Sequence, residues 1–370
     1  MESITQTMNT RVVGLESLVS PSILKDELPA SERSKATVDL GRKNAAAIIN
    51  GKDDRLLVIA GPCSIHDSEQ ASHYAQRLYD EYKRRWKDGL VIVMRAYFEK
   101  PRTTVGWKGL INDPHINGTC KINEGLRVAR QVLLDVTEIG LPVACEVLDN
   151  FTPHYLSDLY SWGAIGARTT ESQLHRQIVS GLSMPIGFKN STDGGVGVSL
   201  DAIRASSQPH TFISLTDQGM SAIVSTTGNH DLHIIHRGGK SGTNYDEHSV
   251  AASKVELSNT LPNKCPSIMI DVSHGNSNKD HRNQMKVAND VADQIERGQD
   301  AIIGVMIESN IKEGKQSEPK NGRTSDDLEY GVSITDGCVS LETTTEILDR
   351  LYAAVLARRL KLRQPRTAKT

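Results

Sequence analysis

Short, continuously apolar segments recur along the chain and alternate with stretches whose apolar residues fall at helical spacing. Such runs are typical of parallel strands buried on both faces, with helices covering the outer face of the sheet. The count of eight matches a (β/α)8 TIM barrel, an α/β fold. An open, doubly wound sheet is the structural alternative, although eight even repeats favour closure. The predicted strands are 56–61, 91–95, 142–147, 164–168, 185–189, 231–238, 267–274 and 301–308.

Two segments stand outside this alternation. Residues 1–33 show no clear period, and we interpret them as an N-terminal arm, partly extended, ahead of a single catalytic domain over 34–370. Segments 211–216 and 221–227 are joined by DQGM alone, which is too short for a crossover helix. They predict an antiparallel hairpin, 211–227, inserted into the repeat. Helices are predicted over 34–50, 67–82, 125–139, 153–162 and 171–180, and from Ser199 onward.

The composition excludes several function classes. Lys and Arg total 43 against 45 for Asp and Glu, so overall charge suggests no nucleic-acid or membrane-surface partner. The sequence contains no apolar run of the roughly 18 residues that a membrane span needs. Its first residues lack the layout of a secretory signal. Five scattered cysteines argue against a disulfide framework, so we expect a cytoplasmic protein.

Each predicted strand ends at or beside a residue that can bind a metal, an anion or a proton. In a (β/α)8 barrel the carboxyl ends of the strands converge on one mouth, where catalytic groups sit. A barrel without a site would scatter such residues at random along its loops, and chance does not account for eight of eight. These residues are Cys63, Arg95, Glu146, Arg168, Lys189, Arg237, His274 and Glu308.

Cations dominate this set, and the loop after the second strand adds Lys100 and Arg102. A single Arg or Lys is usually solvated surface, but six like charges in one cleft repel each other unless anions fill it. They suit a ligand that carries both a carboxylate and a phosphate, together with a second phosphate.

Four residues could hold a metal ion. Cys63, His274 and Glu308 end strands, and Asp336 follows the last strand. A thiol, an imidazole and two carboxylates suit manganese, iron, cobalt or zinc rather than calcium or magnesium. Taken singly, Cys63 could be a buried small hydrophobe and Asp336 a helix N-cap. The interpretation rests on their placement at strand ends, since no HExxH or CxxC motif is present.

Several motifs together resemble the type I 3-deoxy-D-arabino-heptulosonate 7-phosphate (DAHP) synthases, most closely the fungal members. The resemblance runs from about residue 34 to the C-terminus and is looser over the first 33 residues. The matching segments are GPCSIHD (61–67), MRAYFEKPRTTVGWKGLINDP (94–114), WGAIGARTTESQLHR (162–176), GFKN (187–190), RGGK (237–240), IDVSHGNSNKD (270–280), GVMIESN (304–310) and YGVSITD (330–336).

The resemblance implies a reaction and roles for the strand-end residues. Members of the family condense phosphoenolpyruvate with erythrose 4-phosphate, release phosphate and need a divalent metal. The implied metal ligands are Cys63, His274, Glu308 and Asp336; the implied substrate-binding residues are Arg95, Lys100, Arg102, Thr103, Ala167, Arg168, Lys189 and Arg237. Among these, Arg102 and Thr103 would take the sugar phosphate.

The implied catalytic residues are Lys100, Glu146 and Asp336. Glu146 would lie close to the attacking water. Lys100 would protonate the forming alkoxide, with Asp336 or a metal-bound water as the competing donor.

Family members of this length resemble feedback-inhibited enzymes, so an aromatic amino acid is the expected effector. The implied inhibitor site lies between the hairpin, the helix end at Leu182–Ser183 and the loop Asp149–Pro153. Ser214 resembles the phenylalanine-sensitive forms, where glycine would resemble the tyrosine-sensitive ones. A homodimer or homotetramer is also expected. The implied regulatory residues are Asp149, Pro153, Leu182, Ser183, Phe212 and Ser214.

Two rival functions differ from this reading by specific residues. A related synthase that uses a five-carbon sugar phosphate often dispenses with metal and has Asn in place of the cysteine ligand, which Cys63 argues against. A non-catalytic amino-acid sensor that kept the fold would be marked by the loss of a metal ligand, and the four residues above are all present.

Overall fold

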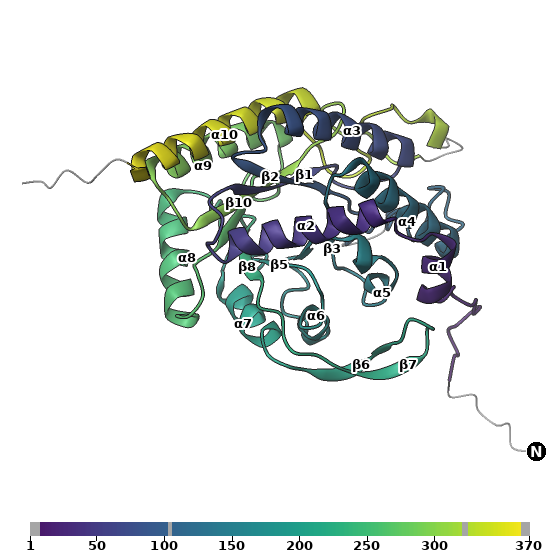
Figure 1. Cartoon of the computed structure of the whole chain (residues 1–370). Helices are drawn as coiled ribbons and strands as arrows, with labels where there is room; N and C mark the ends of the chain where they lie inside the picture. Colours follow the sequence, from purple (N-terminus) through teal and green to yellow (C-terminus); the bar gives the residue numbers. More distant parts are fainter. Residues whose placement is uncertain (1–7, 103–105, 320–324, 364–370) are drawn as a thin grey trace, which may run out of the picture.

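The computed structural model describes residues 8–102, 106–319 and 325–363. Within them, eight parallel strands close into a barrel in the order β1-β10-β9-β8-β5-β4-β3-β2, with helices on the outside (Figure 1). The predicted (β/α)8 barrel is thereby confirmed. The barrel strands are β1 (Leu56–Gly61), β2 (Leu90–Arg95), β3 (Val143–Glu146), β4 (Trp162–Ile165), β5 (Ile186–Lys189), β8 (Leu232–His236), β9 (Ile268–Asp271) and β10 (Ile302–Glu308).

The helices follow from local sequence signals as well as from amphipathic spacing. Helix α3 begins where the Asp67 side chain accepts a hydrogen bond of 3.0 Å from Gln70 N, and α4 ends at Gly140 in the left-handed conformation. The helices are α1 (Pro21–Glu27), α2 (Glu32–Ile49), α3 (Ser68–Arg85), α4 (Ile122–Ile139), α5 (Thr152–Leu156), α6 (Gln173–Val179), α7 (Gly197–Ser206), α8 (Glu247–Thr260), α9 (Gln284–Arg297) and α10 (Leu341–Arg363).

Helix α2 seals one end of the barrel. Its residues Ala45, Ile48 and Ile49 are buried in the same apolar cluster as the inward-facing Leu57 and Trp162. Figure 1 shows α2 lying across the strands. Because this cluster fills the barrel interior, a ligand can reach only the opposite mouth, where the strands have their carboxyl ends.

Several segment boundaries differ from the sequence prediction. The helix expected over 153–162 breaks into α5 and a 3-10 turn at Ser157–Leu159, and β4 already begins at Trp162. The N-terminal arm is not simply extended, because Ser20 caps the helix α1, whose first residue is Pro21. Strand β9 ends at Asp271, so His274 lies on the loop after it rather than in the strand.

The inserted hairpin consists of β6 (Thr211–Leu215) and β7 (Ser221–Ser225), which pair in antiparallel register. It lies outside the barrel beside α5 and α6 (Figure 1). Side chains alternate between its faces: Phe212 and Ser214 are half-buried, whereas Ile213 and its cross-strand partner Ile223 are exposed.

Among the described residues, no helix is long and apolar enough to span a membrane. All five cysteines fall within them, and each is a free thiol.

We expect the barrel interior to carry folding stability. Ile59 is fully buried inside the barrel, whereas Val255 on α8 is 58% exposed. Ile59→Ala should lower the free energy of unfolding by roughly 2–5 kcal/mol, because it removes buried methylenes and leaves a cavity. Val255→Ala is the matched control and should change it by less than about 0.5 kcal/mol. Urea denaturation measures both, and equal effects would contradict the placement of the core.

Candidate active site

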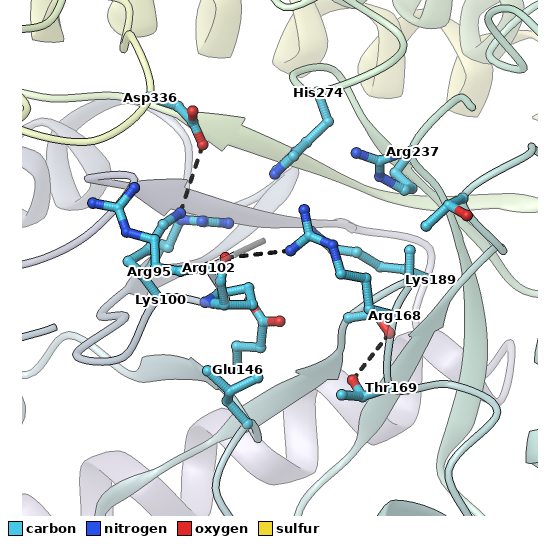
Figure 2. A pocket seen from close by; sticks show the side chains of 15 residues that line it. Arg95, Lys100, Arg102, Glu146, Arg168, Thr169, Lys189, Arg237, His274 and Asp336 are labelled. Atoms are coloured by element: carbon cyan, nitrogen blue, oxygen red, sulfur yellow. Dashed lines mark hydrogen bonds and ion pairs between the residues drawn. The ribbon is translucent and has the colours of Figure 1, made fainter. Parts of the chain in front are cut away.

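A cavity of about 340 Å³ opens at the carboxyl ends of the barrel strands. Figure 2 shows basic side chains from several strands pointing into it. The cavity brings together predicted site residues from distant parts of the chain: it is lined by Arg95, Lys100, Arg102, Glu146, Ala167, Arg168, Lys189, Arg237, His274 and Asp336, with Pro101, Leu148, Gly166, Thr169 and Thr192. Thr103 lies outside the described residues.

Three of the cations are paired with carboxylates, two at the ends of barrel strands and one, Asp336, on the loop between β10 and α10. Arg95 Nη2 lies 3.0 Å from Glu308 Oε1, and both side chains are almost fully buried. Lys189 Nζ lies 3.1 Å from Asp271 Oδ2, and Lys100 Nζ lies 3.7 Å from an oxygen of Asp336. A buried cation needs such a partner, because water cannot solvate it.

Arg168 and Arg237 are different. Within the described part of the chain neither forms an ion pair with a carboxylate, and their guanidinium groups donate only to the backbone oxygens of Pro101 and Gly238. Both line the cavity beside Lys189. Unpaired guanidinium groups that face a shared cavity are a ready binding site for a carboxylate or a phosphate.

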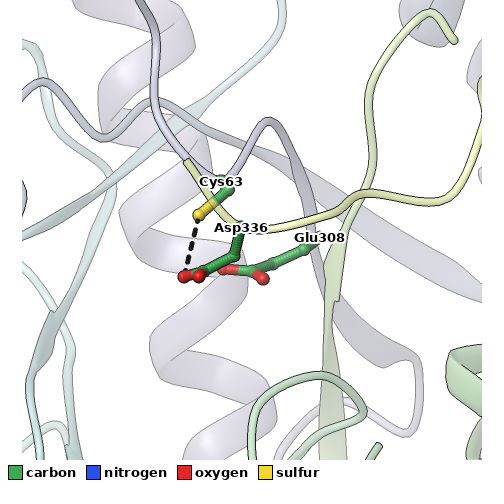
Figure 3. Close-up of side chains that lie close together, drawn as sticks. All are labelled: Cys63, Glu308 and Asp336. Carbon is green, nitrogen blue, oxygen red and sulfur yellow. Dashed lines mark hydrogen bonds between the residues drawn. The ribbon is translucent and has the colours of Figure 1, made fainter. Parts of the chain in front are cut away.

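The register of the sheet brings the predicted metal ligands together. Gly61 pairs with Glu308 across β1 and β10, so Cys63, two residues farther on, lies beside Glu308. Potential ligand atoms of Cys63, Glu308 and Asp336 lie within 4.8 Å of one another, as Figure 3 shows. This thiol and these carboxylates fit a transition metal or zinc.

His274, the fourth predicted ligand, lies at the edge of this cluster. Its Nε2 is 3.7 Å from Glu308 Oε1, and its Nδ1 is 2.9 Å from Asp271 Oδ2. A carboxylate on one ring nitrogen fixes the orientation of the imidazole and leaves the other nitrogen free to bind. Burial alone would raise the pKa of Asp271, but His274 and Lys189 hold it well below the usual value.

The pKa values of the thiol and of the ammonium group at this cluster are both raised, for different reasons. Burial raises the pKa of the Cys63 thiol to about 11, and the Glu308 carboxylate adds to this effect. Burial alone would lower the pKa of Lys100, but Cys63, Glu308 and Asp336 raise it above its ordinary value. Lys100 Nζ donates to Cys63 Sγ at 3.0 Å. Lys100 therefore stays protonated at neutral pH.

Glu146 ends β3 and lines the cavity next to Gly166. A Cβ atom at position 166 would lie 2.4 Å from Glu146 Oε1, so the glycine makes room for this carboxylate. No hydrogen bond to the Glu146 side chain is found among the described residues, which leaves the group available to a ligand or a water molecule.

A buried network holds the backbone at Arg237. Asn190 Oδ1 accepts from Arg237 N at 2.7 Å and from Asn244 Nδ2 at 3.2 Å. His236 Nδ1 lies 2.7 Å from Asn244 O, and its Nε2 lies 2.9 Å from Ser253 Oγ. Since a carbonyl oxygen can only accept, Nδ1 carries the hydrogen. Burial lowers the pKa of His236 to about 4, so the ring remains neutral in this network.

A second cavity, of about 580 Å³, lies between α5, the end of α6 and the hairpin. Five of the six predicted regulatory residues line it: Pro153, Leu182, Ser183, Phe212 and Ser214. Asp149 instead accepts hydrogen bonds from the backbone N–H groups of Phe151 and Thr152 at the start of α5. The cavity also contains the ion pair of Lys25 with Asp217, at 2.9 Å, and His154, whose Nε2 is 2.9 Å from Ser214 Oγ.

Three charged groups at these sites were not singled out from the sequence. Asp271 could have been noticed as a lone carboxylate within an apolar strand, SIMIDVSH. Glu318, which pairs with Arg102, lies on the loop between β10 and α10, and no pattern in that loop marks it. Glu99 is 9% exposed and precedes Lys100, and nothing in its neighbourhood in the sequence predicts that it is buried.

Glu99 links the loop that carries Lys100 to the start of α5. Its Oε2 accepts a hydrogen bond of 3.0 Å from the hydroxyl of Thr152, the first residue of α5. Burial, together with the charges of Asp149 and Glu146, raises the pKa of Glu99 from 4.5 to about 8. The group is therefore largely protonated at neutral pH.

The fold and the cavity define an enzyme of the (β/α)8 class whose mouth combines a cationic anion-binding site with a metal-ligand cluster. The family model "DAHP synthetase I family" matches residues 29–349. The chain belongs to this family.

Relatives with different effectors in their names are similarly close. A tyrosine-inhibited phospho-2-dehydro-3-deoxyheptonate aldolase of Candida albicans is 55% identical and aligns over 96% of this chain and 96% of its own length. A phenylalanine-inhibited one of Saccharomyces cerevisiae is 50% identical over 96% of this chain and 95% of its own. The structure of such an aldolase from Francisella tularensis SCHU S4 superposes with a TM-score of 0.90 at 46% identity, covering 94% of this chain and 99% of that one.

Glu99 should make stability depend on pH. A carboxyl whose pKa is raised by folding contributes stability that is present below about pH 4.5 and is lost as pH rises through about 8. Glu99→Gln should therefore flatten the fall in unfolding free energy between these pH values, measured by urea denaturation. Glu256→Gln, on an exposed residue, is the control. Parallel pH profiles of Glu99→Gln and the unmodified protein would contradict the raised pKa.

Proposed function

We propose that the protein condenses phosphoenolpyruvate with D-erythrose 4-phosphate to give DAHP and phosphate, the first step of aromatic amino-acid biosynthesis. Family membership supports this activity, and one structural observation carries it. Arg168 and Arg237, which have no carboxylate partner in the described part of the chain, face a cavity that also reaches the cluster of Cys63, Glu308 and Asp336 through Asp336. An anionic substrate and an aldehyde placed beside the potential metal ligands could thus meet in one cavity.

Phosphoenolpyruvate binds through charge in this proposal. Arg168, Lys189 and Arg237 contact its carboxylate and phosphate, and Arg95 and Lys100 complete the positive surroundings at the barrel side. Arg95 and Lys189 are held in place before the substrate arrives by carboxylates of the barrel strands, and the Asn190 side chain fixes the backbone at Arg237. Such preorganised charge stabilises an anionic transition state without reorganisation.

The aldehyde of the sugar phosphate approaches the ligand cluster, and Arg102 and Thr103 take its phosphate. A divalent metal held by Cys63, His274, Glu308 and Asp336 would supply Lewis-acid polarisation of the aldehyde. The methylene carbon of phosphoenolpyruvate attacks the aldehyde carbon. Water then adds to the carbon that bears the phosphate, and the carbon–oxygen bond to phosphate breaks.

Lys100 and Glu146 carry out the proton transfers in this proposal. The raised pKa of Lys100 keeps a proton on Nζ, which lies next to the cluster and can pass it to the forming alkoxide oxygen. Asp336 remains the competing donor. Glu146 has no partner among the described residues and is placed to orient the attacking water or to accept its proton.

The second cavity suits an aromatic amino acid. Lys25 and Asp217 offer opposite charges to a zwitterion, and Phe212 offers an apolar face to its ring. We propose phenylalanine as the effector because the Ser214 hydroxyl already occupies His154 Nε2. A tyrosine hydroxyl would have to displace Ser214 or remain unpaired, and an unpaired buried hydroxyl costs roughly 1–3 kcal/mol.

A homodimer or homotetramer and a cytoplasmic location complete the proposal. Ile213, Ile223 and Met220 expose apolar side chains on the hairpin, and a second copy of the chain would cover them. Five free thiols agree with a reducing compartment.

Phosphate release from the two substrates tests the activity. We expect release that requires both substrates, stops with a chelator and returns with added manganese or zinc. Cys63→Ala should retain the fold, by circular dichroism, yet lose most turnover at limiting metal, because it removes a ligand. Release with a five-carbon sugar phosphate would indicate the related synthase. Amino-acid binding without any release would indicate the non-catalytic sensor.

Inhibition assays with both amino acids test the effector. The unmodified enzyme should be inhibited more strongly by phenylalanine than by tyrosine. Ser214→Gly should shift the preference toward tyrosine by about tenfold, since it frees His154 Nε2 for a phenol hydroxyl. Ser183→Gly is the control: Ser183 lines the same cavity but forms no hydrogen bond with His154, so the variant should leave the preference unchanged. Stronger inhibition of the unmodified enzyme by tyrosine would refute the assignment.

A further inference from the structure

The end of the active-site cavity that should take the sugar phosphate is already occupied by a carboxylate. Arg102 lines the cavity, and its Nη2 donates to Glu318 Oε1 in a close ion pair. The side chains are 27% and 20% exposed, so the pair is partly shielded from water. By contrast, Arg168 and Arg237 have no carboxylate partner among the described residues.

The loop around Arg102 holds its guanidinium group from two further sides. Nε donates to Trp107 O at 2.8 Å, and a Cβ atom at position 106 would come within 3.0 Å of Nε, so Gly106 allows the close approach. Both carboxylate oxygens of Glu318 also lie 3.4 Å from Trp107 N. Nη1 is the nitrogen for which no partner is found in the described residues.

Glu318 differs in origin from the carboxylates that pair with Arg95 and Lys189. Asp271 and Glu308 are the last residues of barrel strands, so the sheet fixes their backbone. Glu318, like Asp336, comes from the loop between β10 and α10. The last backbone hydrogen bond found before it in this loop joins Gln316 N to Ser333 O at 2.8 Å. Because Glu318 belongs to no helix or strand, its side chain can turn away from Arg102 without disrupting one.

A phosphate should bind this guanidinium group more strongly than Glu318 does. It carries up to two charges and offers several acceptor oxygens that match the fork of an arginine. It would take the Nη2 position held by Glu318 and could also reach the unpartnered Nη1. The carboxylate and the phosphate thus compete for the same donors, and only one of them can hold Nη2.

We propose that the Glu318 carboxylate occupies the position of the sugar phosphate on Arg102. It neutralises Arg102 in the absence of substrate and is displaced when the phosphate binds. This inference rests on the proposed function, because it takes Arg102 as the sugar-phosphate residue. Glu318 acts through Arg102 as a positioning residue. The apparent affinity for the sugar phosphate is lowered by whatever free energy the Arg102–Glu318 pair contributes.

Steady-state kinetics of Glu318→Gln and Glu318→Ala test this. Both variants should lower KM for erythrose 4-phosphate, by about three- to tenfold for the alanine variant and less for glutamine, which retains a neutral acceptor. KM for phosphoenolpyruvate and kcat should stay within about twofold. Glu313→Gln is the matched control: it lies on the same loop, but its carboxylate pairs with His281. A purely structural role for Glu318 would not separate the two substrates in this way.

Sulfate binding, measured by calorimetry on the metal-loaded protein, probes the same site without turnover. Glu318→Ala should bind sulfate more tightly than the unmodified protein, and Arg102→Ala should abolish this gain in the double variant. If sulfate affinity and KM for erythrose 4-phosphate are unchanged or weakened in Glu318→Ala, the inference is overturned.

The experiments distinguish failure of the inference about Glu318 from failure of the proposed activity. If Arg102→Ala leaves KM for erythrose 4-phosphate unchanged, Arg102 does not bind the sugar phosphate, and the displacement of Glu318 falls with it. If the unmodified protein forms no DAHP but Glu318→Ala still tightens sulfate binding through Arg102, the proposed activity is wrong while the competition between Glu318 and an anion stands.

Discussion

Mutual repulsion among basic side chains is the constraint that shapes the mouth of this barrel. Six of them line one cavity: Arg95, Lys100, Arg102, Arg168, Lys189 and Arg237. Where such groups are buried, each has to be neutralised, because the barrel excludes the water that would solvate it. The structure meets this demand with two strand-end carboxylates, Glu308 and Asp271, and with Asp336 and Glu318 from the loop between β10 and α10. Among the described residues Arg168 and Arg237 have no carboxylate partner, and this is where we propose that an external anion binds.

Asp271 shows how one buried carboxylate serves both halves of the site. Its Oδ2 lies 3.1 Å from Lys189 Nζ on the substrate side and 2.9 Å from His274 Nδ1 on the metal-ligand side. The same negative charge therefore holds the ammonium group of Lys189, which we propose binds the substrate, and orients the imidazole of His274 toward Glu308. Asp271 touches neither proposed ligand site directly. Its loss would leave a buried ammonium without a partner, so both halves of the site depend on it.

The strand-end rule explains how much of this site the sequence could predict. The alternation of apolar strands and helices fixes the barrel, and the barrel fixes which residues face its mouth, so Cys63, Arg95 and Lys189 could be placed without coordinates. Pairing partners could not be placed. Whether Arg102 faces an open cavity or Glu318 depends on how the loop after β10 folds back, and loop conformation leaves no period in the sequence.

The misplaced boundary of α5 has a consequence for regulation. A helix over 153–162 would have been long enough for its two ends to contact separate parts of the protein. The observed helix has five residues, and its first and third both make functional contacts. Thr152 donates to Glu99, which precedes Lys100, and His154 contacts Ser214 on the hairpin. Because Thr152 and His154 lie in the same helical turn, we expect an effector that shifts the backbone at His154 to reach the loop that carries Lys100 through the Thr152–Glu99 hydrogen bond.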